Sequence, residues 1–199
     1  MKSAQRFSVL GALLLAAAFA SSAHAQGIGF VKVCNNGKMA GSGTCPSNPV
    51  LGTKPKQWGC TWDTSRGVMW QLGQSDGGTL DKSRQFTRFE PSTPGYGDPT
   101  DSAGFAVAVN EMRLCGSKKW RLPTLAELSS SVDRRFVDPA IDLSWFPNTY
   151  PDDYWTSELF PFDLRQAYTV NFFDGVEDWY PHAMTSTYVR LVAKKIYTP

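Results

Sequence analysis

The stretch WRLPTLAEL, residues 120–128, predicts a turn fixed onto the start of a helix. Thr124 can accept a hydrogen bond from the Glu127 N–H while the Glu127 carboxylate accepts one from the Thr124 N–H, which is the geometry of a capping box. Apolar residues follow with helical spacing at Leu125, Leu128, Val132 and Phe136. We therefore expect a helix that begins after Thr124 and buries this face.

Residues 1–25 are typical of a signal peptide. Lys2 and Arg6 precede an apolar run, and the small-residue pattern of residues 23–25 precedes Gln26. The run is too short for a good membrane span, and no cysteine of the kind that carries a lipid anchor follows it. We expect an exported protein, either periplasmic or secreted to the cell surface, that begins at Gln26 after processing.

The processed chain is balanced in charge. Of 20 Lys and Arg residues, Lys2 and Arg6 lie in the expected leader, which leaves 18 basic against 18 acidic residues. Nucleic acid binds basic surfaces and is therefore a poor candidate partner. Residues 26–199 are enough for one domain with a sizeable core, and the sequence leaves the oligomeric state open.

Four cysteines in an exported chain predict two disulfides, with three possible connectivities. They are Cys34, Cys45, Cys60 and Cys115. The first two enclose a Gly, Asn and Ser-rich loop with little to bury, so a local staple is the simplest pairing and leaves Cys60 for Cys115. The spacing does not resemble a zinc site, and we expect structural bridges.

Many Gly and Pro residues and a 13% aromatic share favour a loop-rich α+β or mainly β domain. We expect an irregular, disulfide-tied arm over residues 26–57 and the domain proper over 58–199. Within the domain the pattern predicts a hairpin over 60–72, a long loop over 73–101 and a helix over 103–115 that buries Phe105, Val109 and Met112 and stops at Gly116. Strands are expected at 154–160, 167–173 and 187–195.

Five motifs in order resemble the Lcl C-terminal domain family, a domain of unknown function, over roughly residues 58–195. They are WGCTWDTSRGVMWQ, LCGSKKWRLPTLAEL, IDLSWFPNTYPDDYWTS, AYTVNFFDG and YVRLV. The resemblance implies a C-type-lectin-like fold, with two helices beside a small twisted antiparallel sheet, the terminal strands meeting, and long loops. It also implies an exported or surface protein, since the best-understood members are adhesins that bind sulfated glycans.

Many members carry a cysteine beside the last-strand arginine, where this chain has Leu191 after Arg190, so Cys60 is the sensible partner for Cys115. The collagen-like stalk of the family's namesake is absent.

In such a fold the 120–128 motif has a structural role. Trp120 and Leu122 are expected in the core, and Pro123 and Thr124 set the helix start that Glu127 completes. The Arg121 guanidinium can bind backbone carbonyls or hold a carboxylate bidentately.

The chain lacks the usual parts of an enzyme. It has no Gly-x-Ser-x-Gly elbow, and the processed chain keeps one histidine, His182. The formylglycine-generating enzymes share a similar helix start, but their chemistry depends on cysteines near the C-terminal end, and none follows Cys115 here. A glycosidase-like carboxylate pair stays open among the acids of the C-terminal third: Asp152, Asp153, Glu158, Asp174, Glu177 and Asp178.

We expect no cofactor. The sugar-binding triplets of calcium-dependent lectins are missing, and FDGVED lacks the EF-hand spacing, although the same acids keep calcium open. The basic pairs Lys118, Lys119 and Lys194, Lys195 are the candidates for a sulfate-binding patch.

Three functional classes follow, in order of preference. The first is a non-catalytic binding module for glycans or cell-surface ligands; the second is an envelope protein that binds other proteins without a small ligand; the third is an enzyme. A ligand site is expected in the segment 174–186, because it exceeds the length a hairpin needs and carries two large rings. The candidate residues are Trp179, Tyr180, Asp178, Glu177 and His182.

Overall fold

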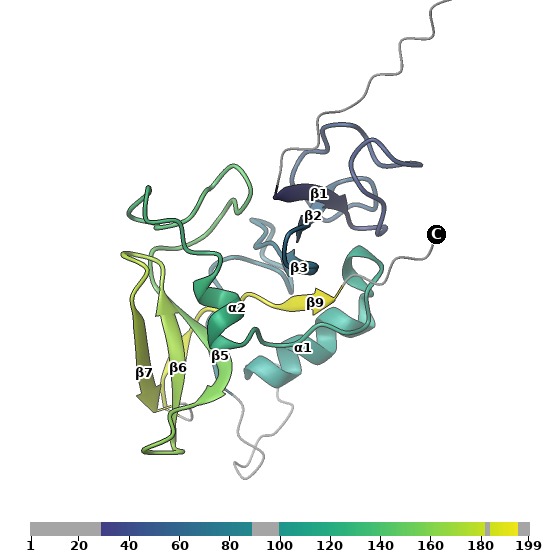
Figure 1. Ribbon diagram of the computed structural model, residues 1–199. Coiled ribbons are helices and arrows are strands. Elements are labelled where there is room, and N and C mark those ends of the chain that lie inside the picture. The colour runs from purple at the N-terminus through teal and green to yellow at the C-terminus, as the bar shows by residue number, and fades with distance from the viewer. Residues whose placement is uncertain (1–28, 89–99, 182–183, 195–199) are drawn as a thin grey trace, which may run out of the picture.

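The computed structural model describes residues 29–88, 100–181 and 184–194, so the expected signal peptide lies outside the described residues. The described chain forms three small antiparallel sheets and two α-helices (Figure 1). The first sheet has the order β1 (Phe30–Cys34), β2 (Trp58–Asp63), β3 (Val68–Gln71) and β9 (Val192–Lys194). The second pairs β4 (Phe86–Thr87) with β8 (Ser186–Thr187), and the third has the order β5 (Asp153–Leu159), β6 (Gln166–Asn171) and β7 (Glu177–Pro181). An α+β, disulfide-stapled chain is therefore confirmed. No described helix has the length and apolar character needed to cross a membrane.

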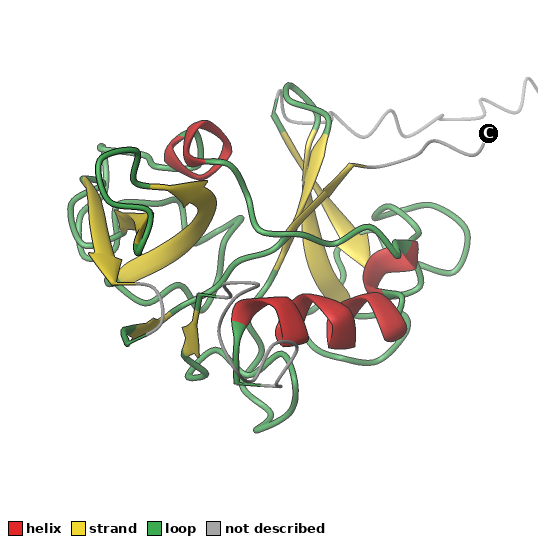
Figure 2. Ribbon diagram, turned by 90° about the horizontal axis from the view of Figure 1, so that it is seen from below, coloured by secondary structure: helices red, strands yellow, loops and turns green. Residues whose placement is uncertain are grey.

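The first sheet is buried on both faces. Successive residues of β3 alternate, so Met69 joins one apolar cluster while Val68 and Trp70 join another. The helix α1 (Ser102–Glu111) covers the first cluster with Phe105 and Val109 (Figure 2). The helix α2 (Leu125–Ser129) lies between the first and third sheets and adds Leu128 to the second cluster (Figure 1). The described chain therefore has two apolar cores, one on each face of the first sheet.

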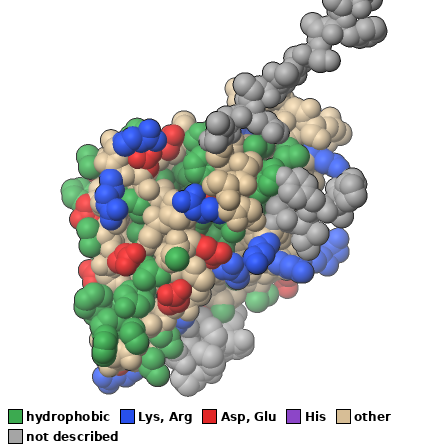
Figure 3. Space-filling model, in the orientation of Figure 1, with side chains coloured by type: hydrophobic (Ala, Val, Ile, Leu, Met, Phe, Trp, Pro, Cys, Tyr) green, Lys and Arg blue, Asp and Glu red, His purple; other side chains and the backbone are tan. Residues whose placement is uncertain are grey.

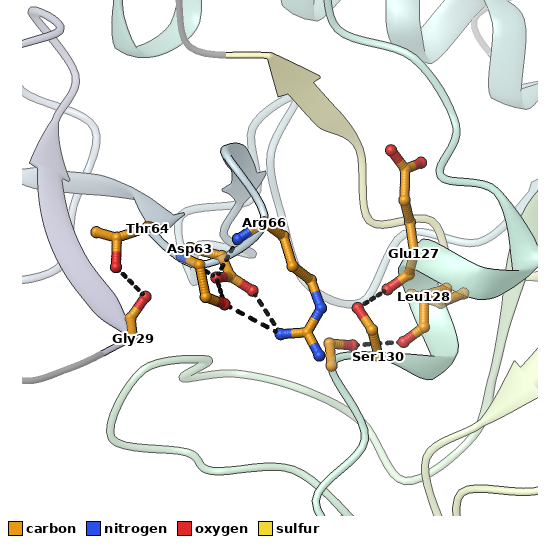
Figure 4. A network of polar contacts seen from close by, with 9 residues as sticks. Gly29, Asp63, Thr64, Arg66, Glu127, Leu128 and Ser130 are labelled. Carbon is orange, nitrogen blue, oxygen red and sulfur yellow. Dashed lines mark hydrogen bonds and ion pairs between the residues drawn. The ribbon is translucent and has the colours of Figure 1, made fainter.

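The hairpin predicted over 60–72 is confirmed as β2 and β3. The buried Asp63 carboxylate accepts hydrogen bonds from the Ser65 N–H at 2.9 Å and the Arg66 N–H at 3.1 Å, and it pairs with the Arg66 guanidinium at 3.0 Å (Figure 4). Gly67 completes the turn with a φ of +67°, a conformation that L side chains rarely adopt. Turn chemistry that is local in sequence was therefore sufficient to predict this element.

Both disulfides have the predicted pairing. Cys34 bonds to Cys45 across 11 residues, and Cys60 bonds to Cys115 across 55 residues. The second bridge joins β2 to the 3₁₀ turn Leu114–Gly116 inside the first core. It ties α1 and the following turn to the centre of the sheet.

Both predicted helices are shorter than expected. The first ends at Glu111, because Arg113 adopts the left-handed conformation, and Gly116 belongs to the next turn instead. Met112 is consequently half-exposed rather than buried. The second ends at Ser129, so Phe136 does not extend its apolar face and is exposed.

Two segments expected to be irregular form strands. Residues 30–34 of the N-terminal arm pair with β2 as an edge strand of the first sheet. Residues 177–181, expected in a loop, pair with β6 as β7. The strand expected over 187–195 is instead divided into β8 and β9, and β9 pairs with β3 rather than with the N-terminal strand.

The two disulfides should contribute unequally to stability. Replacing Cys60 and Cys115 together by Ala is expected to lower the free energy of unfolding by about 4 kcal/mol, against about 3 kcal/mol for Cys34 and Cys45, since the longer loop gains more entropy in the unfolded chain. Urea denaturation of both double variants measures the difference. A larger loss of unfolding free energy in the Cys34 and Cys45 variant would contradict this ranking of the two disulfides.

Candidate functional site

The WRLPTLAEL stretch is fixed at every step by protein contacts. The Trp120 ring lies in the first core and its Nε1–H donates to the Leu114 carbonyl at 3.0 Å. The side chain of Asn110 accepts from the Trp120 N–H at 2.7 Å and donates to its carbonyl at 2.9 Å. The Arg121 backbone pairs with Val192 of β9 through two hydrogen bonds of 3.0 and 2.8 Å. Pro123 is buried and its carbonyl accepts from the Ser157 N–H of β5 at 2.7 Å, while Leu122 is partly buried against the first core.

The predicted capping box is present. Thr124 Oγ1 accepts from the Glu127 N–H at 3.1 Å, and Glu127 accepts from the Thr124 N–H at 2.8 Å. Arg121 holds the same carboxylate with two hydrogen bonds of 2.8 and 2.7 Å. The Arg121 hydrogen bond is the largest cause that lowers the pKa of Glu127. The side chains of Arg121 and Thr124 therefore both bind Glu127 within the motif.

Strand pairing divides the predicted ligand residues between two faces. Because side chains alternate along a strand, Glu177 and Trp179 lie on one face of β7, while Asp178 and Tyr180 lie on the other. Asp178 therefore does not share the face on which a ligand would stack on Trp179. Glu177 shares the Trp179 face, where its carboxylate accepts from the Ser129 hydroxyl at 2.7 Å. His182 lies outside the described residues.

The Trp179 face carries an aromatic patch, formed by Phe160, Phe162, Tyr168 and Trp179. The rings of Trp179 and Phe160 stack almost parallel, at 4.7 Å and 1°, and Tyr168 meets both rings edge-on. Trp179 is 43% exposed and Phe162 is 88% exposed. Hydrophobic side chains gather over this part of the third sheet, at the lower left of Figure 3. Trp179 thus folds back onto Phe160 and still presents part of its ring to solvent.

The opposite face carries a polar cluster, formed by Asp153, Thr169, Asn171, Asp178 and Tyr180. The Thr169 hydroxyl donates to Asp153 at 3.0 Å, and the Tyr180 hydroxyl donates to Asp178 at 3.1 Å. Burial, followed by the neighbouring negative charges of Asp152 and Asp178, raises the pKa of Asp153. Burial and the Asp153 charge raise the pKa of Tyr180 to about 12, so this hydroxyl keeps its proton at neutral pH.

The remaining candidate residues are dispersed. The Glu158 carboxylate accepts from the Leu125 N–H at the start of α2, and Asp174 accepts from the Val176 N–H in the turn before β7. Lys118, Lys119 and Lys194 are exposed, while Lys195 lies outside the described residues. Within the ranges that the structure describes, no group of three or more His, Cys, Asp or Glu side chains could hold a metal ion.

The sequence did not reveal which residues accompany the predicted ligand residues on the two faces of the third sheet. It singled out Trp179 but not Phe160, Phe162 or Tyr168, and it did not connect Asp153 with Tyr180. The signal in EDWYP was weak, because two acidic residues precede two aromatic residues instead of alternating with them as in a half-buried strand. Its acidic content therefore favoured a loop over a strand.

The described molecule is a disulfide-stapled α+β domain with an exposed aromatic patch on its third sheet. The profile of the Lcl C-terminal domain matches residues 59–193, and the chain belongs to this family. No curated protein and no solved structure matches it.

Truncation of Trp120 should destabilise the fold strongly. Trp120→Ala is expected to lower the free energy of unfolding by about 3 to 5 kcal/mol through a core cavity, whereas Thr124→Ala should cost about 1 kcal/mol through loss of the cap. Thermal and urea denaturation measure both. An unchanged stability in Trp120→Ala would show that the motif is not structural.

The raised pKa of Asp153 predicts a specific pH dependence. The folded state retains this proton to a higher pH than the unfolded state, so the group makes the protein progressively less stable as pH rises from about 4 through the raised folded pKa. The stability of Asp153→Asn relative to wild type should therefore increase between pH 3.5 and pH 7. Asp174→Asn removes an exposed charge from the nearby turn and serves as the control. A relative stability of Asp153→Asn that stays constant or falls over this range would refute the assignment.

Proposed function

We propose that this chain is a non-catalytic binding module that holds glycans or other cell-surface ligands at the aromatic patch. The observation that carries the proposal is the parallel Phe160–Trp179 stack, which leaves Trp179 43% exposed beside the 88% exposed ring of Phe162. Large rings exposed together to water are unfavourable unless a partner covers them. A flat indole ring backed by a second ring is a rigid surface for the apolar face of a sugar.

The polar groups available to such a ligand are limited by strand geometry. Glu177 lies on the Trp179 face and has one described hydrogen-bond partner, Ser129, so it is the carboxylate placed to accept from sugar hydroxyls. The exposed pair Lys118 and Lys119 is a separate candidate for sulfate groups, since a sulfated glycan is long enough to contact more than one surface.

Further parts of the proposal concern fold type and location. We assign the domain to the C-type-lectin-like class and expect it in the periplasm or at the cell surface. Membership of the Lcl C-terminal domain family and two disulfides support this assignment. We propose neither a catalytic step nor a resident cofactor, and calcium is tested directly with a chelator below.

A second candidate is a protein-binding role at the same patch. Leu164 extends the patch beyond Phe162 along the 160–165 connection, and both side chains are more than half exposed. Such an apolar extension favours a protein surface over a sugar, because protein interfaces centre on aromatic and aliphatic anchors.

A glycan array, run with calcium, with chelator and at two salt concentrations, separates these candidates. Trp179→Ala should weaken glycan binding about tenfold or more while the melting temperature stays close to wild type. Phe136→Ala is the matched control, because Phe136 is 42% exposed and is not one of the rings that form the aromatic patch. The expected salt response is modest unless Lys118 and Lys119 take part.

Two outcomes would contradict the glycan proposal. Equal binding by wild type and Trp179→Ala would remove the patch as the site. An array without signal, together with a stable protein complex that Phe162→Ala disrupts, would support the second candidate instead.

A further inference from the structure

A small cavity lies between the first core and the third sheet, away from the aromatic patch. Its volume is about 20 Å³, and its polar wall is formed by Gln71, Asp81, Lys82, Arg84, Asn148 and Arg190. A cavity holds one water molecule when its volume is at least about 10 to 15 Å³. This cavity therefore has room for one small group and not for a sugar ring.

Arg190 is the unusual member of this wall. It is only 3% exposed, and its guanidinium lies over the rings of Phe146, Tyr154 and Phe172 at 5.3 to 5.6 Å. One nitrogen, Nη2, donates to the Thr149 hydroxyl at 2.6 Å, whereas the buried Nη1 has no hydrogen-bond partner.

The charge of Arg190 is not balanced by an acid among residues 29–88, 100–181 and 184–194. The ion pairs found there join Arg66, Arg121, Arg135 and Arg165 to acidic neighbours, and none includes Arg190. A buried cation is costly unless an anion or several hydrogen bonds compensate it. Aromatic rings supply part of this compensation, but they carry no net charge.

The rest of the wall makes the cavity more positive. Lys82 lies over the Tyr150 ring at 5.7 Å, and Arg84 contributes a second cation. The one acid, Asp81, accepts hydrogen bonds from the Ser83 hydroxyl and from backbone N–H groups of Ser83 and Gly77, which lower its pKa to about 2. Its oxygens are thus occupied by its own turn. Three cations face one carboxylate around a space that fits one small group.

We propose that this cavity binds one small monovalent anion, either a halide ion or the carboxylate group of a larger ligand. Arg190 and Lys82 supply the charge. Gln71 Oε1 accepts from the Leu191 N–H at 3.4 Å, so the Gln71 amide nitrogen is the end of that side chain able to donate to the anion. Sulfate is divalent and larger than formate or bromide, and it serves as the reference anion.

Anion titration of the full chain at constant ionic strength tests the proposal. Sodium sulfate is replaced stepwise by sodium formate, sodium bromide or sodium glucuronate in chloride-free buffer, and the melting temperature is recorded. Formate or bromide should raise it saturably, by about 3 to 6 °C at ten times the dissociation constant. A matching effect of glucuronate identifies the carboxylate of an acidic sugar as an accepted source, while a bromide effect alone identifies a free ion.

Two lysine variants separate the site from general charge effects. Lys82→Gln should weaken the apparent anion affinity about two- to fivefold, and Lys56→Gln, at an exposed lysine outside both the cavity wall and the proposed glycan site, should leave it unchanged. Bromide-soaked crystals should show anomalous density in the cavity. The proposal is overturned if formate, bromide and sulfate act alike, if both variants lose affinity equally, or if bromide is absent from the cavity.

Discussion

The extended segment of residues 120–124 is the constraint on which the rest of the structure depends, because it connects two separate cores. At one end Trp120 enters the core under α1, and at the other Thr124 starts α2, whose Leu128 enters the second core. Between them the backbone of Arg121 pairs with Val192, and the Pro123 carbonyl accepts from Ser157. A single short stretch therefore fixes the first sheet, the third sheet and both helices relative to one another.

The connecting role of residues 120–124 explains why the motif contains residue types that are often found in functional sites. The fixed φ of Pro123 ends the paired segment outside the helix, and the Arg121–Glu127 pair completes the capping box. Trp120 needs a partner for its indole N–H when it is buried, and the Leu114 carbonyl provides it. The polar side chains of this motif therefore have hydrogen-bond partners within the described fold.

Features encoded by neighbouring residues could be predicted from the sequence. The capping box at Thr124, the turn after Asp63 and the local staple of Cys34 and Cys45 depend on spacing within a dozen residues. Elements that need a distant partner were missed: β1 becomes a strand because β2 offers its edge, and β7 because β6 does. The exposure of Phe136 likewise depends on where α2 ends, which the apolar periodicity did not reveal.

The candidate site was only partly predictable for the same reason. Composition identified Trp179 as a ring without an obvious core role, but its stacking on Phe160 depends on the geometry of the third sheet. The pairing of β6 and β7 then separates Trp179 from Asp178, so the face that carries Trp179 contains fewer acids than the sequence indicates. Arg190 shows the opposite case, because a residue in an ordinary strand motif becomes a buried cation only when Phe146, Tyr154 and Phe172 surround it.

Native-state hydrogen exchange tests the central claim most directly, because it reports the free energy needed to open individual hydrogen bonds. If the 120–124 segment holds both cores together, the amides of Arg121, Val192 and Ser157 should exchange only through global unfolding, with the same free energy as amides in β2 and β6. Exchange of these three amides through a low-energy local opening, while β2 and β6 stay protected, would contradict the claim.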